Sequence, residues 1–158
     1  MPEAVIVSAA RSPIGRANKG SLVDLRPDDL TATIIQAALA KIPELDPKTI
    51  DDHYLGCGLP GGESGNNMAR VVNVLMGFDE VPGATITRYC SSSVQTTRMA
   101  FHAIKAGEGH AGVVVAGQRL ADDGDRGDAA DEGEQGDDHD ERENCGQFVR
   151  HDRSFLLL

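Results

Sequence analysis

Several features that define other classes of protein are missing from this sequence of 158 residues. No apolar run approaches the ~20 residues that cross a bilayer, so we expect a soluble protein with no membrane association. The apolar stretch at 4–9 lacks the basic segment that precedes it in a secretory signal. Three cysteines, an odd number without short spacing, argue against a disulfide framework and against a zinc site. We therefore expect the reducing cytoplasm as its setting.

The net charge of -10 is confined to one segment. Residues 122–147 carry twelve Asp or Glu and two Arg, whereas the rest of the chain has thirteen acidic and thirteen basic residues. Neither part has the basic surface that nucleic-acid binding requires. The segment 122–146 has almost no apolar side chain to bury, and we expect it to be disordered. Its first aspartates do not fit the spacing of a calcium-binding EF-hand loop, so the sequence predicts no metal site.

Apolar runs and amphipathic segments alternate before that acidic segment. The predicted strands are 4–9, 52–57, 84–89 and 111–116. The predicted helices run from Pro27 to before Pro43, from after Asn67 to Gly77, and from about 90 to 106. Three such alternations favour an α/β layer with a mainly parallel sheet. We therefore predict a domain at 1–117 and an acidic tail at 118–158, whose last residues, 155–158, are too short to form an element.

A glycine-rich loop at 58–65 joins the second strand to the second helix. Its first part, Gly56-Cys57-Gly58-Leu59-Pro60-Gly61, matches the dinucleotide pattern G-x-G-x-x-G. The helix starts several residues after the last glycine, so its N-terminus cannot meet a pyrophosphate group. We interpret the segment as a loop, with Asn66 or Asn67 capping the helix. The apolar face predicted for that helix comprises Met68, Val71, Val72, Leu75 and Met76.

Cys90 lies where the third strand passes into the third helix. A cysteine on a buried helix is usually a small apolar residue. At the start of a helix, however, free backbone N–H groups and the helix dipole stabilise a thiolate. Ser91, Ser92 and Ser93 are small, so they leave room for a substrate and add hydroxyl donors. A thiol nucleophile needs a base, but His102 lies about 18 Å further along the same helix, so both interpretations stay open.

Three separated stretches resemble the N-terminal half of a thiolase, an acetyl-CoA C-acyltransferase. They are "VIVSAARSPIGR" in the first strand, "GNNMAR" at the second helix and "VPGATITRYCSSSVQTTRMAFHAIKAGEG", all in family order. The resemblance covers about residues 3–116 and implies the layered, mainly parallel α/β fold. It also implies that Cys90 is catalytic and takes the acyl group as a thioester. Coenzyme A thioesters are then substrates, and no separate cofactor is implied.

The resemblance implies two directions of reaction and an oligomeric assembly. In the degradative direction, as in fatty acid β-oxidation, a 3-ketoacyl-CoA is cleaved to acetyl-CoA and a shortened acyl-CoA. In the synthetic direction, two acyl-CoA molecules undergo Claisen condensation. Thiolases assemble as dimers or tetramers, and both acyl-CoA and free coenzyme A are their partners.

The family also uses a Gly-His-Pro histidine, a second cysteine in a Cys-x-Gly motif and an Asn-Glu motif. These motifs do not occur in the printed sequence, where Cys145-Gly146 is followed by Gln147. The compositional break after Gly117 suggests a reading-frame change near 109–118, and we expect this chain to be weakly active or inactive by itself. One alternative is a truncated, non-catalytic module that binds a partner through its acidic tail. Another is a β-ketoacyl synthase, although "TRYCSSS" fits the thiolases better.

Overall fold

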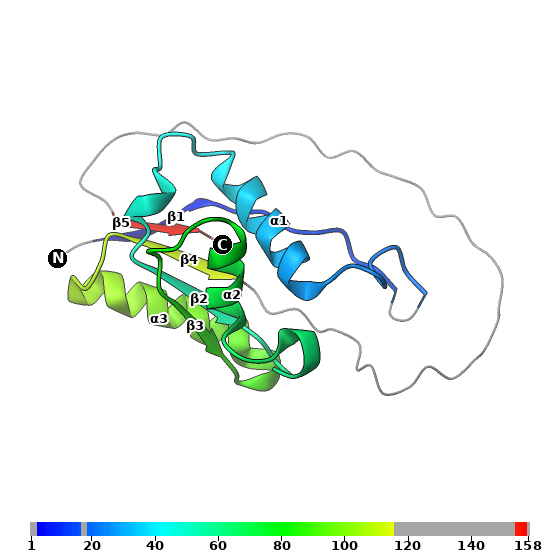
Figure 1. Ribbon diagram of the computed structural model, residues 1–158. Helices are drawn as coiled ribbons and strands as arrows, with labels where there is room; N and C mark the ends of the chain where they lie inside the picture. The colour runs from blue at the N-terminus through cyan, green and yellow to red at the C-terminus, as the bar shows by residue number, and fades with distance from the viewer. Residues whose placement is uncertain (1–2, 17–18, 116–153, 158) are drawn as a thin grey trace. The chain divides into compact units, whose positions relative to one another are not determined.

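The computed structural model describes residues 3–16, 19–115 and 154–157, and contains one five-stranded sheet. The strands are β1 (Ala4–Ser8), β2 (Asp52–Gly56), β3 (Gly83–Ile86), β4 (Ala111–Val115) and β5 (Ser154–Leu157). Their order across the sheet is β1-β5-β4-β2-β3, and every pairing is parallel. The helices are α1 (Pro27–Leu39), α2 (Met68–Leu75) and α3 (Ser92–Ala106), as Figure 1 shows. The predicted α/β class with a parallel sheet is confirmed.

The last four described residues correct one prediction. Ser154–Leu157 form strand β5 between β1 and β4, although the sequence indicated that the end of the chain was too short for an element. Phe155 is in register with Val5 on one side and with Ala111 on the other. A strand with a neighbour on each side can satisfy its backbone groups over a few residues, and its own sequence gives no sign of those neighbours. The predicted disorder of 122–146 lies outside the described residues.

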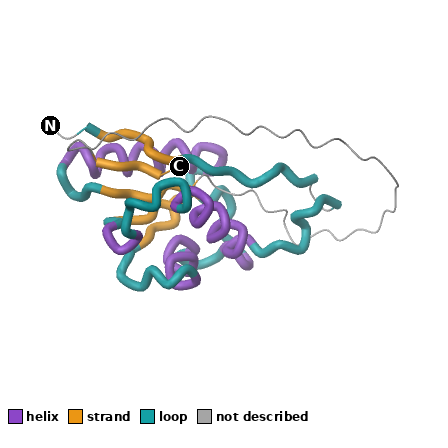
Figure 2. The backbone as a smooth tube through the Cα atoms, turned by 90° about the horizontal axis from the view of Figure 1, so that it is seen from above, coloured by secondary structure: helices purple, strands orange, loops and turns teal. Residues whose placement is uncertain are grey.

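The helices pack on the two faces of the sheet according to the alternation of side chains along the strands. Val113 and Val115 of β4 join the main core, which α1 and α2 cover with Ile35, Ala69 and Val72. Val114, between those two valines, packs instead with Ala100 of α3. Figure 1 shows α1 and α3 on either side of the strands, and Figure 2 shows the strands lying next to one another. The helix α3 therefore leads away from the end of β3 across the second face.

The buried face of α2 differs from the predicted one. Met68 and Val72 are buried as expected, but Val71 and Leu75 are 45% and 53% exposed. Ala69 and Asn73 are buried in their place. The helix lies against β3 and α1, and this orientation depends on tertiary contacts that apolar periodicity alone does not determine. Among the described residues, no helix is long and apolar enough to cross a membrane.

The N-terminus of α2 is held by a residue from the sheet. Asn67 occupies the N-cap position, but its side chain makes no capping bond. Its amide donates instead to the carbonyl of Gly83 at 2.6 Å, and its Oδ1 accepts from Thr85 Oγ1 at 3.0 Å. The Thr85 hydroxyl in turn accepts the backbone N–H of Ala69 at 3.0 Å. Asn67, one of the two predicted residues, holds the N-cap position, but the predicted capping by its side chain is wrong, because the oxygen that accepts the Ala69 N–H belongs to Thr85 of β3.

Candidate active site

Cys90 lies in a short turn at the carboxyl edge of the sheet, between β3 and α3. The turn is a 3-10 helix, η3 (Tyr89–Ser91), so the α-helix begins at Ser92, slightly later than predicted. Cys90 is exposed. Tyr89, directly before it, has φ of +49°, a left-handed conformation that is unfavourable for a large L side chain. The thiol therefore projects from a tightly bent segment rather than from the body of a buried helix.

Ser92 closes this turn with its side chain. Its Oγ donates to the carbonyl of Tyr89 at 2.7 Å and accepts the backbone N–H of Arg88 at 2.9 Å. Ser92 is only 2% exposed, whereas Ser91 is exposed. The expected supply of hydroxyl donors to a substrate is therefore wrong for Ser92, because its hydroxyl is committed to the backbone of Arg88 and Tyr89, directly before Cys90.

The glycine-rich segment after β2 packs against the same turn. A Cβ atom added to Gly56 would lie 3.0 Å from the backbone carbon of Ser92, and one added to Gly58 would lie 3.3 Å from the carbonyl oxygen of Tyr89. Cys57, between these glycines, is buried, and its N–H donates to Ile86 at 2.9 Å. The pattern predicted as an ordinary loop is indeed a loop, and its glycines let the start of α3 approach β2 closely.

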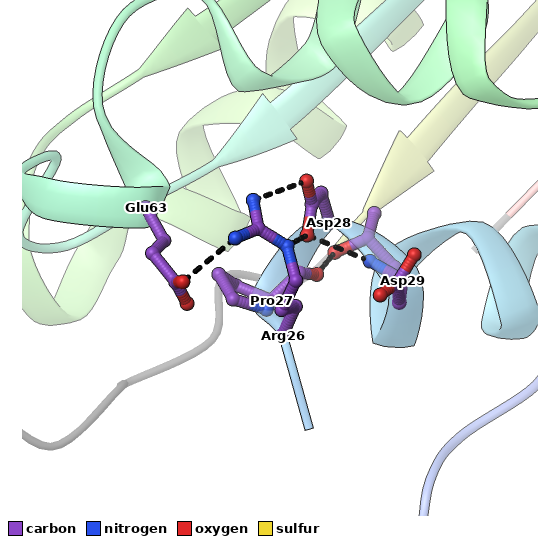
Figure 3. Close-up of polar contacts among 6 residues, drawn as sticks. Arg26, Pro27, Asp28, Asp29 and Glu63 are labelled. Atoms are coloured by element: carbon purple, nitrogen blue, oxygen red, sulfur yellow. Dashed lines mark hydrogen bonds and ion pairs between the residues drawn. The ribbon is translucent and has the colours of Figure 1, made fainter. Parts of the chain in front are cut away.

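An arginine ties the far part of this loop to α1. Arg26 Nη1 lies 2.7 Å from Glu63 Oε1, in the 3-10 turn η2 (Gly62–Ser64), and Nη2 lies 2.9 Å from Asp28 Oδ2. Figure 3 shows the guanidinium between the two carboxylates. The hydrogen bond from Arg26 is the main reason that the pKa of Asp28 is lowered. This contact connects the N-terminus of α1 with the loop that follows β2.

Two histidines of the described chain, His53 and His102, have partners away from Cys90. His53 of β2 is fully buried, and its Nδ1 lies 2.7 Å from Asn73 Oδ1 on α2. His102 is exposed on α3 and contacts Arg98, one turn back, at 3.5 Å. Its separation along the helix agrees with the prediction that it does not pair with Cys90. No group of three or more His, Cys, Asp or Glu side chains in the described part of the chain is arranged to hold a metal ion.

The amide of Asn73 determines which nitrogen of His53 carries the proton. Asn73 Nδ2 donates to the carbonyls of Val81 and Pro82, both at 3.0 Å, so its Oδ1 must be the acceptor facing the imidazole. His53 Nδ1 is therefore the protonated nitrogen of a neutral ring. Burial lowers the pKa of His53, partly opposed by the bond to Asn73. His53 and Asn73 thus form a structural pair between β2 and α2.

Three residue roles at this site differ in how far the sequence signals them, and two have no signal. Ser92 belongs to a run of three serines, and nothing in that run marks the middle one as buried. The left-handed backbone of Tyr89 falls on a residue type that rarely adopts it. Gly56 does carry a signal, since a glycine at the end of a strand often marks a close approach of another backbone.

These features describe a parallel α/β domain with an exposed thiol at the carboxyl edge of its sheet. A family model described as the N-terminal domain of thiolase matches residues 4–143, and the chain belongs to the thiolase family. The match extends beyond the motifs at 3–116. The family model and the three sequence motifs thus indicate the same family.

Individual relatives agree with this assignment. The chain is 45% identical to a 3-ketoacyl-CoA thiolase of Bacillus subtilis (strain 168) over 108 residues, which are 68% of this chain and 27% of the relative. It is 42% identical over 116 residues to a beta-ketoadipyl-CoA thiolase of Pseudomonas knackmussii, covering 73% of this chain and 28% of the relative. A crystal structure of the Bacillus anthracis acetyl-CoA acetyltransferase superimposes with a TM-score of 0.61 at 34% identity, covering 67% of this chain and 26% of that one. The chain thus spans about a quarter of the length of the relatives it matches.

Proposed function

We propose that this chain carries the nucleophile of an acyl-CoA acyltransferase, and that Cys90 accepts the acyl group as a thioester. The observation that carries the proposal is the position of Cys90, exposed on the η3 turn directly before α3. Cys90 lies two residues before Ser92, the first residue of the fifteen-residue helix α3, whose N-terminus is the positive end of the helix dipole. Cys57, by contrast, is buried after β2. Membership of the thiolase family supports the same chemistry.

The proposed reaction has two steps. In the first, Sγ of the Cys90 thiolate forms a bond to the C3 carbonyl carbon of a 3-ketoacyl-CoA, and the C2–C3 bond breaks. The electron pair of that bond remains on C2, which takes up a proton and leaves as acetyl-CoA. In the second, the thiol sulfur of free coenzyme A attacks the acyl carbon, the bond to Cys90 breaks, and the shortened acyl-CoA leaves. The Cys90 sulfur accepts the proton that coenzyme A loses.

We propose 3-ketoacyl-CoA as the substrate class, with free coenzyme A as the acceptor and no further cofactor. The names of the relatives support this class, since they include a 3-ketoacyl-CoA thiolase and a beta-ketoadipyl-CoA thiolase. Those two names also differ in the acyl group. Fatty acid β-oxidation is therefore one setting that we propose, with degradation of a dicarboxylic acyl chain as the other. A cytoplasmic location remains a prediction of the cysteine content.

Acetoacetyl-CoA incubated with the purified chain tests the proposal. We expect one acetyl group on Cys90 by peptide mass spectrometry, with one acetyl-CoA released for each acetylated chain. The Cys90→Ser variant should release none and carry no adduct at residue 90. The Cys57→Ser variant is the matched control, because that thiol is buried, and it should behave like the unaltered chain. An unmodified Cys90, or an equal release of acetyl-CoA by Cys90→Ser, would refute the proposed role.

A further inference from the structure

We propose that Ser92 is a positioning residue that holds Cys90 in its reactive orientation. This inference rests on the proposed function, in that it assigns a role to Ser92 relative to the Cys90 nucleophile. Ser92 does not itself reach solvent, being 2% exposed, so it acts through the turn. The role follows from where its hydroxyl bonds, from the strained backbone beside Cys90 and from the packing behind Ser92.

The hydroxyl of Ser92 bonds the backbone directly before Cys90, at Arg88 and Tyr89, and so closes the turn that carries Cys90. It accepts from the N–H of Arg88 at 2.9 Å and donates to the carbonyl of Tyr89 at 2.7 Å. The backbone N–H of Ser91 also donates to Arg88, at 3.0 Å. A hydroxyl with both a donor and an acceptor partner has no freedom to rotate. Cys90 therefore lies within a loop of backbone whose two ends are joined by one side chain.

These bonds differ from those of an ordinary helix cap. A capping serine precedes the helix and accepts an N–H from its first turn. Ser92 is instead the first residue of α3, the N-cap position is Ser91, and Ser91 makes no side-chain capping bond. The hydroxyl of Ser92 reaches backward, away from the body of the helix. Its loss should therefore affect the η3 turn more than the stability of α3.

The conformation of Tyr89 explains why the turn needs this support. Its φ of +49° is unfavourable for a non-glycine residue, so the backbone tends to relax unless its neighbours hold it. The Tyr89 side chain is 74% exposed and contributes little packing of its own. The bond from Ser92 ends on the carbonyl of Tyr89 itself. Removing that bond should let the segment that carries Cys90 move away from the start of α3.

The body of the domain fixes Ser92 from behind. A Cβ atom added to Gly56 would lie only 3.2 Å from the Cβ of Ser92, which shows how closely β2 approaches this residue. Because Ser92 is also almost completely buried, its side chain lies between β2 and the backbone that it binds. The position of Cys90 is thus fixed by strand β2, by the contact of Gly56 with Ser92 and by the Ser92 hydroxyl.

Alkylation of Cys90 by iodoacetamide, mapped by peptide mass spectrometry, measures the effect in the full chain. In Ser92→Ala we expect the rate at pH 7 to fall about three- to tenfold, the size of one lost hydrogen bond, because the turn no longer holds the thiol in one orientation. Thr97→Ala is the matched control, since Thr97 Oγ1 also donates to a backbone carbonyl of α3, that of Ser93, at 2.9 Å. Its rate should stay within about twofold, because a hydroxyl bond of similar strength is lost away from the turn.

A second pair of variants covers the case in which Ser92→Ala does not fold. Ser92→Thr and Ser92→Val have the same shape, and only the threonine keeps the hydroxyl. We expect Cys90 to be alkylated faster in the threonine variant than in the valine variant. Equal rates in this pair, or equal effects of Ser92→Ala and Thr97→Ala, would overturn the positioning role.

The results also separate this inference from the proposed function. If Ser92→Ala slows alkylation but acetoacetyl-CoA leaves Cys90 of the unaltered chain unmodified, the positioning role holds and the acyltransferase role fails. If Cys90 is acetylated but the Ser92 variants match their controls in alkylation, the acyltransferase role holds and the positioning role fails.

Discussion

The buried pair of His53 and Asn73 gives a quantitative test of the fold around β2 and α2. The perturbation is a double-mutant cycle with His53→Leu, Asn73→Leu and the combination of both. Leucine suits position 73 because it branches at the same atom as asparagine. It suits position 53 because it replaces the imidazole with a side chain that has no polar atom. The two side chains meet through a 2.7 Å hydrogen bond, and both residues are almost completely buried.

The structure limits how many polar groups each single variant leaves unpaired. Asn73→Leu removes a donor from the carbonyls of Val81 and Pro82, but Val81 keeps Arg70 Nη1 at 2.9 Å, and Pro82 keeps the N–H of His53 at 3.2 Å. Only His53 Nδ1–H loses its partner. His53→Leu likewise leaves only Asn73 Oδ1 unpaired. One buried unpaired group costs about 1–3 kcal/mol, so Asn73→Leu should lose about that much free energy of unfolding. His53→Leu should lose less, because it also removes His53 Nε2, a buried atom with no hydrogen-bond partner among the described residues.

The double variant should cost clearly less than the sum of the two single variants. With both polar partners gone, no buried group is left unpaired, so we expect a coupling energy of about 1–2 kcal/mol. Urea denaturation, monitored by circular dichroism, measures the free energies of unfolding of the unaltered chain, the two single variants and the double variant. Additive costs, within experimental error, would show that the two side chains do not interact in the folded chain.

The same pair predicts how stability depends on pH. Burial lowers the pKa of His53 in the folded state below its value of about 6.5 in an unfolded chain. As pH falls below 6.5, the unfolded state therefore gains a proton that the folded state does not, and folding becomes less favourable. This contribution is fully present above pH 6.5 and is lost on acidification toward the folded-state pKa. His53→Leu should remove this part of the pH dependence, and an unchanged slope between pH 6.5 and 5 would contradict a neutral, buried imidazole.

Two further substitutions test the packing around Cys90. Gly56→Ala should lower the free energy of unfolding by about 1–3 kcal/mol and slow Cys90 alkylation, because its Cβ would lie 3.0 Å from the backbone of Ser92. Gly61→Ala is its control, with no atom within 4 Å of the added Cβ, and equal effects of the two would refute the close approach. Tyr89→Val should cost about 1–2 kcal/mol in urea denaturation, since a β-branched residue tolerates left-handed φ poorly, while Tyr89→Gly should cost less. A valine variant as stable as the glycine variant would contradict the φ of Tyr89.

The local sequence was sufficient to predict the elements that follow from apolar runs and from glycine and proline. The Val-rich run of β4 and the Gly107 that ends α3 with φ of +78° are signals of this kind. The alternation of predicted strands and helices was enough to predict a parallel α/β sheet. The position of Cys90 near a helix start was also predictable, because a strand pattern, a cysteine and an amphipathic segment follow one another.

Contacts between distant segments were not predictable in this way. The four residues of β5 become a strand only because β1 and β4 lie on either side of them. Val71 and Leu75 look like core residues by periodicity, but the orientation of α2 buries Asn73, whose polar partner is twenty residues away in β2. Ser92 is distinguished from its serine neighbours by its burial and by the bonds of its hydroxyl to Arg88 and Tyr89. In each case a tertiary neighbour decides the role, and a single sequence does not identify that neighbour.

We propose Cys90, in the η3 turn directly before α3, as the acyl-accepting thiol of this chain. The most direct test of this claim is a time course with acetyl-CoA, in which peptide mass spectrometry follows acetylation of Cys57, Cys90 and Cys145 in the same sample. We predict that the acetyl group appears first and predominantly on Cys90, and that Ser92→Ala slows its appearance there. Acetylation of the three cysteines at similar rates, or at Cys57 or Cys145 before Cys90, would contradict the claim.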